Sequence, residues 1–168
     1  MPLLAILLGV AGLIPFIVCG LGAISANQGQ AAVMLAALVG YGAVALSFLG
    51  GIHWGFALWT ASAESEAAVP PDARAARVRR MRLLLGVVPS LIGWVALLIQ
   101  MALPDWTALV VLIAGFLATV IVEHQAAQRT LIHPARYMWL RWGLTIVVIA
   151  MLVTVLTLRL LGPRIILW

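Results

Sequence analysis

The feature that most constrains this chain is a long stretch without Asp, Glu, Lys or Arg, residues 31–61. Its apolar residues do not alternate, as those of a half-buried strand do, and they continue far past strand length. A helix needs about 20 predominantly apolar residues to cross the roughly 30 Å hydrocarbon core of a bilayer. The stretch is therefore predicted to form a membrane-spanning helix.

The composition is that of an integral membrane protein. The chain is 65% hydrophobic and 9% charged, whereas soluble domains average about 45–50% apolar and about 25% charged residues. All ten basic residues are arginines. Because they flank apolar segments, as positive loops that set topology do, no nucleic-acid partner is expected. Cys19 is the single cysteine, which excludes an intramolecular disulfide and a cysteine metal site.

Five segments are long and apolar enough to cross a membrane, and they predict an all-α, polytopic helix bundle in one domain. The predicted spans are 3–25, 32–61, 83–103, 106–122 and 140–161. The first span is expected to remain in the mature chain, because it lacks the basic start of a signal peptide and its apolar run is too long. Pro15 removes a backbone donor and should bend this span near mid-depth.

The longest polar loop, residues 62–82, begins acidic with Glu64 and Glu66 and ends as a basic amphipathic stretch. Such a stretch is attracted to the headgroups of anionic membrane lipids. The residues expected to contact headgroups are Arg74, Arg77, Arg79, Arg80 and Arg82.

Arginines also predict the topology. The loop after the fourth span holds Arg129, Arg136 and Arg141, and in a five-span chain it lies on the same side as the loop 62–82. That side carries eight arginines, against two near the C-terminus, Arg159 and Arg164. The positive-inside rule therefore predicts the N-terminus inside and the C-terminus outside.

Residues 41–55, YGAVALSFLGGIHWG, carry two features of the second span. Ala43, Ser47, Gly51 and Gly55 recur at spacing four and form a stripe of small residues that allows two helix backbones to approach in lipid. His53 lies about 160° around the helix from Gly51, on a face shared with Gly42, Leu49 and Gly50. The residues assigned to helix packing are Ala43, Ser47, Gly50, Gly51 and Gly55.

His53 is the main candidate for binding a ligand or a proton, together with Tyr41 and Ser90. It lies roughly 10–12 Å inside the membrane, at the depth of Pro89, which leaves the carbonyl of Leu85 without its helical donor. One interpretation is an interhelical hydrogen bond worth about 0.6 to 2 kcal/mol. The other is a functional contact, because ionisable residues inside membranes are costly and mark functional sites.

Glu123 and His124 end the fourth span at the inner interface, and adjacent helix residues point about 100° apart. Glu123 is expected to pair with a nearby loop arginine, such as Arg129. A metal site, or an acid–base site, would require His53 to come close to them, and a haem would require a second histidine at the depth of His53. Neither of the other histidines is expected to meet that requirement, because His124 lies near the membrane surface and His133 lies in a loop. No metal, cofactor or enzymatic activity is expected, because the chain has no P-loop, nucleophile elbow, zinc motif or pair of deep carboxylates.

Several segments together resemble a known family: GLIPF at 12–16, YGAVALSFLGGIHWG at 41–55, VPSLIGWVALL at 88–98 and RYMWLRWGLT at 136–145. They are similar to the uncharacterised family of small inner-membrane proteins that includes mitochondrial transmembrane protein 69. The resemblance implies a multi-span protein of bacterial or mitochondrial inner membranes. It implies no catalytic residues.

Two functions are consistent with these observations. The first is a non-enzymatic accessory, structural or assembly subunit that packs against other integral subunits of a respiratory or photosynthetic complex in the bacterial inner membrane. The small-residue stripe and the minimal soluble portion favour it. The alternative is a carrier or binding protein for a quinone, a lipid or a haem, with His53 as its polar contact. It predicts a cavity beside His53, bounded by Gly50 and the kink at Pro89.

Overall fold

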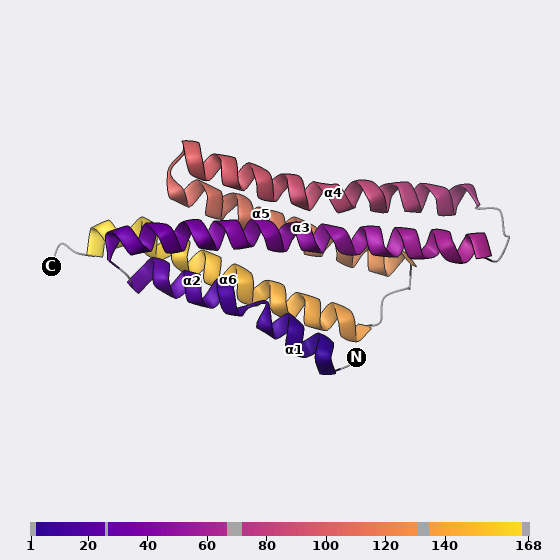
Figure 1. Ribbon diagram of the computed structural model, residues 1–168, viewed down its shortest axis with the longest axis horizontal. Helices are drawn as coiled ribbons and strands as arrows, with labels where there is room; N and C mark the ends of the chain where they lie inside the picture. Colours follow the sequence, from indigo (N-terminus) through magenta and orange to yellow (C-terminus); the bar gives the residue numbers. More distant parts are fainter. Residues whose placement is uncertain (1–2, 26, 67–71, 131–134, 166–168) are drawn as a thin grey trace.

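The computed structural model describes residues 3–25, 27–66, 72–130 and 135–165, and their regular secondary structure is entirely α-helical (Figure 1). The helices are α1 (Leu3–Ala11), α2 (Ile14–Ser25), α3 (Gln28–Glu66), α4 (Ala73–Ala102), α5 (Asp105–Thr130) and α6 (Ala135–Ile165). Since α1 and α2 together make one span, five helical spans are long and apolar enough to cross a membrane. The predicted all-α class is confirmed, and so are five helical segments long and apolar enough to span a membrane.

The helices extend further than the hydrophobic pattern predicted. Most of the predicted loop 62–82 is helical, because α3 continues to Glu66 and α4 begins at Ala73. Similarly, α6 begins at Ala135, so Arg141 lies inside a helix instead of in the loop after the fourth span. Helix propensity favours Glu and Arg, and it continues a helix into water where hydrophobicity has already ended.

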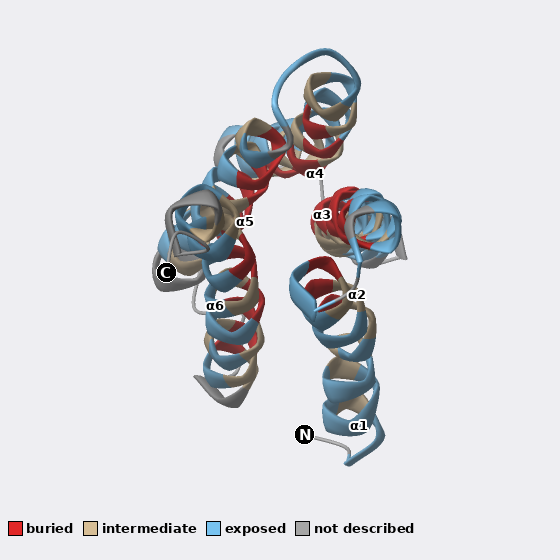
Figure 2. Cartoon of the chain, turned by 90° about the vertical axis from the view of Figure 1, so that its left-hand side faces the viewer, coloured by how far each residue is buried: buried red, intermediate tan, exposed pale blue. Residues whose placement is uncertain are grey.

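The spans form a bundle in which chain neighbours are also spatial neighbours. Helix α3 packs against α2 and α4, α5 packs against α4 and α6, and α2 packs against α6. Viewed along the helices, the buried residues lie on the facing sides of α3, α4, α5 and α6 (Figure 2). The core is largely leucine, including Leu38, Leu46, Leu109, Leu112 and Leu152. The last turns of α3 and α5 and the first turns of α4 and α6 lie toward one end, on the right of Figure 1, called the arginine-rich end below.

The first span is broken between α1 and α2, as Pro15 predicts. Proline has no N–H, and its ring disfavours a continuous helix through the preceding turn. The chain makes a tight turn instead, in which the amide of Leu13 donates to the carbonyl of Val10 (2.9 Å). The hydroxyl of Tyr41 on α3 donates to the carbonyl of Gly12 (2.9 Å). The second span therefore supplies a hydrogen-bond donor to a backbone carbonyl at the break in the first span.

The closest helix contact joins α3 and α4, and of the residues assigned to helix packing it uses Ala43 and Gly50. A Cβ at Gly50 would overlap the carbonyl oxygen of Gly86, and one at Gly93 would lie 2.9 Å from the backbone of Ala43. Ala43, Gly50 and the fully buried Ala57 are spaced by seven residues, as are Gly86 and Gly93. The face that carries His53 and Gly50 is therefore the packed face of α3.

The stripe at spacing four does not carry this contact beyond Ala43. Ser47, Gly51 and Gly55 are exposed, and no atom lies within 4 Å of a Cβ built at Gly51 or Gly55. The reason is geometric. A step of four residues turns about 40° around a helix, while a step of seven turns only about 20° the other way, so spacing seven follows a nearly parallel neighbour for longer.

Candidate functional site

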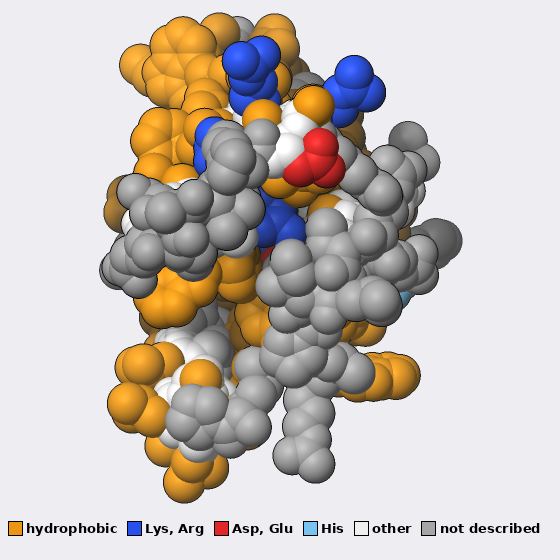
Figure 3. All heavy atoms as spheres, turned by 90° about the vertical axis from the view of Figure 1, so that its right-hand side faces the viewer, with side chains coloured by type: hydrophobic (Ala, Val, Ile, Leu, Met, Phe, Trp, Pro, Cys, Tyr) orange, Lys and Arg blue, Asp and Glu red, His pale blue; other side chains and the backbone are white. Residues whose placement is uncertain are grey.

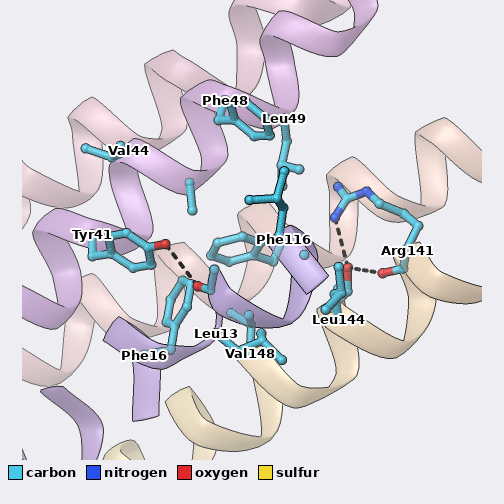
Figure 4. Close-up of a pocket in the computed structure, with 15 residues that line it drawn as sticks. Leu13, Phe16, Tyr41, Val44, Phe48, Leu49, Phe116, Arg141, Leu144 and Val148 are labelled. Atoms are coloured by element: carbon cyan, nitrogen blue, oxygen red, sulfur yellow. Dashed lines mark hydrogen bonds between the residues drawn. The ribbon is translucent and has the colours of Figure 1, made fainter. Parts of the chain in front are cut away.

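A cavity of about 400 Å³ lies beside the break in the first span, between α1–α2, α3, α5 and α6 (Figure 4). We call it the lateral cavity. Its lining is apolar except for three residues, Tyr41, Arg141 and Thr145. Among the residues that the structure describes, the lining comprises Leu8, Gly9, Gly12, Leu13, Phe16, Tyr41, Val44, Ala45, Phe48, Leu49, Phe116, Arg141, Leu144, Thr145 and Val148.

Aromatic rings form much of one wall. Phe16 meets Tyr41 edge to face with 5.0 Å between ring centroids, and it meets Phe116 in the same way at 5.9 Å. Edge-to-face pairs hold aromatic rings in defined orientations. Figure 4 shows Tyr41 and Arg141 on opposite sides of the cavity, with Phe116 between them.

Arg141 belongs to a buried polar network between α5 and α6. Its Nε donates to Glu123 Oε2 (2.7 Å), and its Nη1 donates to the hydroxyl of Thr145 (3.1 Å). Tyr137 completes the network by donating its hydroxyl to Glu123 Oε1 (2.7 Å). The side chains of Arg141 and Glu123 are 7% and 4% exposed, so this ion pair is shielded from solvent.

The sequence builds this network through helical spacing. Tyr137, Arg141 and Thr145 follow one another at intervals of four, which places them on one face of α6. Glu123 lies on the facing helix α5. Because α6 begins before Arg141, the guanidinium enters the apolar span about 6 Å beyond the Tyr137 end.

One donor of this arginine has no acceptor. Nη2 of Arg141 is buried and makes no hydrogen bond. A buried unsatisfied donor costs about 1–3 kcal/mol, and more when the group is charged. Since Arg141 also lines the lateral cavity, a ligand oxygen in the cavity is the kind of acceptor that this donor lacks.

His53 is buried (8% exposed) and lines a separate pocket between α3, α4 and α5. Pro89 lines this pocket, as predicted, but Gly50 does not, because Gly50 is in contact with α4. The pocket holds only about 50 Å³, which is room for a water molecule but not for a quinone or haem. Ser90 is half-buried and lines neither this pocket nor the lateral cavity.

Tyr41, Glu123 and His124 do not line the pocket that contains His53. Tyr41 lines the lateral cavity, while its hydroxyl proton is used in the bond to Gly12. Glu123 pairs with an arginine, as predicted, but the partner is the buried Arg141; the side chain of Arg129 lies outside the described residues. His124 packs edge to face on Trp142, with 6.0 Å between ring centroids. Among the described residues, no three His, Cys, Asp or Glu side chains gather as metal ligands do.

The predicted headgroup arginines lie along the first turns of α4, at the arginine-rich end, where arginine side chains border hydrophobic surface (Figure 3). Arg77 and Arg80 are exposed and Arg79 is half-buried, while the side chain of Arg74 lies outside the described residues. Arg82 differs from them, because it is 7% exposed and its guanidinium lies 6.0 Å from the centre of the Phe56 ring.

A further hollow, of about 620 Å³, lies away from the arginine-rich end, between α3 and α4 alone. It is lined by Ala32, Leu35, Ala36, Leu97, Gln100 and Met101. Its described lining comes from two helices and includes no charged residue. The lateral cavity is bounded on more sides and has a buried charged donor, so it is the better candidate for a binding site.

Sequence reasoning placed Arg141 among the topology-setting loop arginines and did not select Tyr137 or Thr145. The signal that identifies them is present: three polar residues at intervals of four, at the start of an apolar span. An arginine at the end of a span usually reaches water, so this pattern needs the facing Glu123 before it indicates a buried site.

Comparison with known proteins agrees with the predicted resemblance. The chain is 33% identical over 149 residues to a protein of Xenopus tropicalis named Transmembrane protein 69. The match covers 89% of this chain and 52% of that relative, so the chain spans about half of the relative's length. No solved structure matches the chain. The family model described as "Protein of unknown function (DUF3429)" matches residues 1–157, and the chain therefore belongs to that family.

Proposed function

We propose that this multi-pass membrane protein binds a lipophilic ligand in the lateral cavity, as a carrier or binding protein. The observation that carries the proposal is the buried Nη2 of Arg141, which lacks an acceptor, in an arginine that lines an apolar cavity of about 400 Å³. Small-molecule sites typically measure about 300–1,000 Å³ and combine apolar walls with a few polar groups. Arg141, and not His53, is the polar contact in this proposal.

A ligand would enter from the side, through the lipid. The cavity is lined by the exposed residues Leu8, Val44 and Phe48, and α1 contains no buried residue. Helix α1 is therefore held by fewer core contacts than the other spans, and it can move with little loss of buried surface. A lipophilic molecule already dissolved in the bilayer reaches such an opening without crossing water.

The test is to fill the cavity. Ala45→Phe places a ring in the cavity, and Ala37→Phe makes the same change at an exposed position of the same helix that lines no pocket described above. Each protein is purified in mild detergent, and its bound molecules are extracted and identified by mass spectrometry. We expect one lipophile enriched over bulk lipid in the wild type and in Ala37→Phe, but lost from Ala45→Phe. Equal content in all three proteins would refute the proposal.

A second candidate function rests on a different surface. Ser47, Gly51 and Gly55 leave an open strip of small residues on α3, which supports contact with a helix of another membrane subunit. In this second proposal the protein is an accessory, structural or assembly subunit of a respiratory or photosynthetic complex in the bacterial inner membrane. The Arg-rich end would face the cytoplasm.

The subunit proposal is tested by a tagged pull-down from native membranes. Gly51→Leu should release membrane subunits that co-purify with the wild type, because its side chain fills the open strip. Ala37→Leu, on another exposed part of α3, should retain them. A wild-type protein that is isolated alone after gentle extraction would exclude this function.

A further inference from the structure

The charge balance beside the lateral cavity indicates what kind of ligand head it accepts. Of the described residues that line the cavity, Arg141 alone is charged, and its charge is already balanced by Glu123 at 2.7 Å. The ion pair as a whole is neutral. A ligand with a net negative head would therefore bring an uncompensated charge into an apolar site, which is unfavourable.

The unused hydrogen-bonding groups complete the description. Nε and Nη1 of Arg141 have acceptors in Glu123 and Thr145, and Nη2 has none. Across the cavity, Tyr41 already donates its proton to Gly12. The Nη2 atom of Arg141 therefore needs a hydrogen-bond acceptor. That acceptor need not be negatively charged, because Glu123 already balances the charge of Arg141.

The walls favour a flat molecule. Phe16, Tyr41 and Phe116 present ring faces and edges held by their mutual edge-to-face contacts. Phe48 adds a fourth ring to the lining. Flat conjugated rings pack well against such surfaces, in offset-stacked or edge-to-face arrangements.

Resting on the proposed binding function, we propose that the ligand is a neutral lipophile with a flat head and a carbonyl oxygen, of the quinone class, and that this oxygen accepts a hydrogen bond from Nη2 of Arg141. The Nη2 atom is covered by protein in the structure. Binding therefore includes a small movement of a side chain that covers this atom. Leu49 and Leu144 line the cavity together with Arg141 (Figure 4).

The experiment compares three probes with the same ten-carbon chain: a decyl benzoquinone, decanoate and decanol. The protein is placed in nanodiscs of zwitterionic phospholipid at neutral pH, and thermal unfolding is followed by tryptophan fluorescence at equal mole fractions of probe in the membrane. A ligand that binds only the folded state raises the midpoint according to its affinity. We expect the wild type to bind the quinone about tenfold tighter than decanol or more, with decanoate weakest.

Changing the charge balance of the Glu123–Arg141 pair should change which of the three probes binds tightest. Glu123→Gln leaves the arginine uncompensated, so decanoate should then bind tightest. The double variant Glu123→Gln/Arg141→Met keeps the site neutral without the guanidinium, so the quinone should lose its advantage over decanol. The double variant also tests the inference if Glu123→Gln alone does not fold.

The outcomes separate the two proposals. If no probe raises the midpoint of the wild type more than that of Ala45→Phe, the binding function itself is wrong. If binding depends on Ala45 but decanoate binds the wild type tightest, the ligand class is wrong while the binding function stands. The same conclusion follows if the quinone keeps its advantage in the double variant.

Discussion

Gly50 and Gly51 are adjacent in α3 but should respond in opposite ways to the same substitution. A Cβ at Gly50 would overlap the carbonyl oxygen of Gly86, whereas a Cβ at Gly51 would meet no atom within 4 Å. Because the atom in the way at Gly50 is backbone, Gly50→Ala requires α3 and α4 to move apart. Gly51→Ala requires no movement.

The magnitudes follow from two opposing effects. Replacing a mid-helix glycine by alanine stabilises a helix by roughly 0.5–1 kcal/mol. Inserting a methyl group into a filled interface costs about 1–3 kcal/mol, and occasionally more. Gly51→Ala should therefore be neutral or stabilising by up to about 1 kcal/mol. Gly50→Ala should lower the free energy of unfolding by up to about 2.5 kcal/mol after the helix gain is subtracted, with a mid-range value of about 1 kcal/mol.

The assay is reversible unfolding in mixed micelles, titrated with SDS and followed by tryptophan fluorescence, on the purified protein without partners. The spacing-four stripe, read from the sequence alone, predicts the opposite result, with Gly51 the sensitive position. Equal effects of the two substitutions, or a larger loss at Gly51, would refute the assignment of Gly50 to the α3–α4 contact.

Three further predictions concern the ion pair, the helix break and the topology. Arg141→Met leaves the Glu123 carboxylate buried and should cost about 3–5 kcal/mol; in a double-mutant cycle by SDS unfolding, Glu123→Gln/Arg141→Met should cost clearly less than the two single changes added, and additive costs would contradict the pairing. Tyr41→Phe removes one hydrogen bond to the broken span and should cost about 0.5–1.5 kcal/mol in the same assay, so an unchanged unfolding curve would show that this bond does not stabilise the break. In a cysteine-free background, an impermeant maleimide added to intact cells should label Ala102→Cys but not Asp72→Cys, and the reverse pattern would invert the proposed topology.

Local properties of the sequence predicted the spans and a bend in the first one. Hydrophobicity over about 20 residues identifies a span without any knowledge of its neighbours. Pro15 acts on the backbone of its own turn, so its effect is also local, and the structure breaks the helix between α1 and α2. The ends of the helices were less predictable, because helix propensity continues past the point where hydrophobicity ends.

Contacts between helices could not be predicted in the same way. The choice between a stripe at spacing four and one at spacing seven depends on the angle at which α3 and α4 cross, and a single sequence does not contain that angle. Similarly, a carboxylate at position 123 predicts an arginine partner, but which arginine depends on how α5 and α6 pack. The lateral cavity depends on four or more helices at once, and its residues have no common spacing.

The buried ion pair of Glu123 and Arg141 joins α5 and α6 at a high cost in desolvation free energy. Replacing a buried ion pair by well-packed apolar residues is often neutral, or stabilising by about 1–4 kcal/mol. Where such a pair serves stability alone, each donor that finds an acceptor lowers its cost. In this chain Thr145 and Glu123 engage two of the guanidinium nitrogens, while Nη2 has no acceptor and Arg141 lines the lateral cavity. That arrangement is unfavourable for the empty protein, and it is favourable if a ligand oxygen supplies the third acceptor, as the proposed binding function requires.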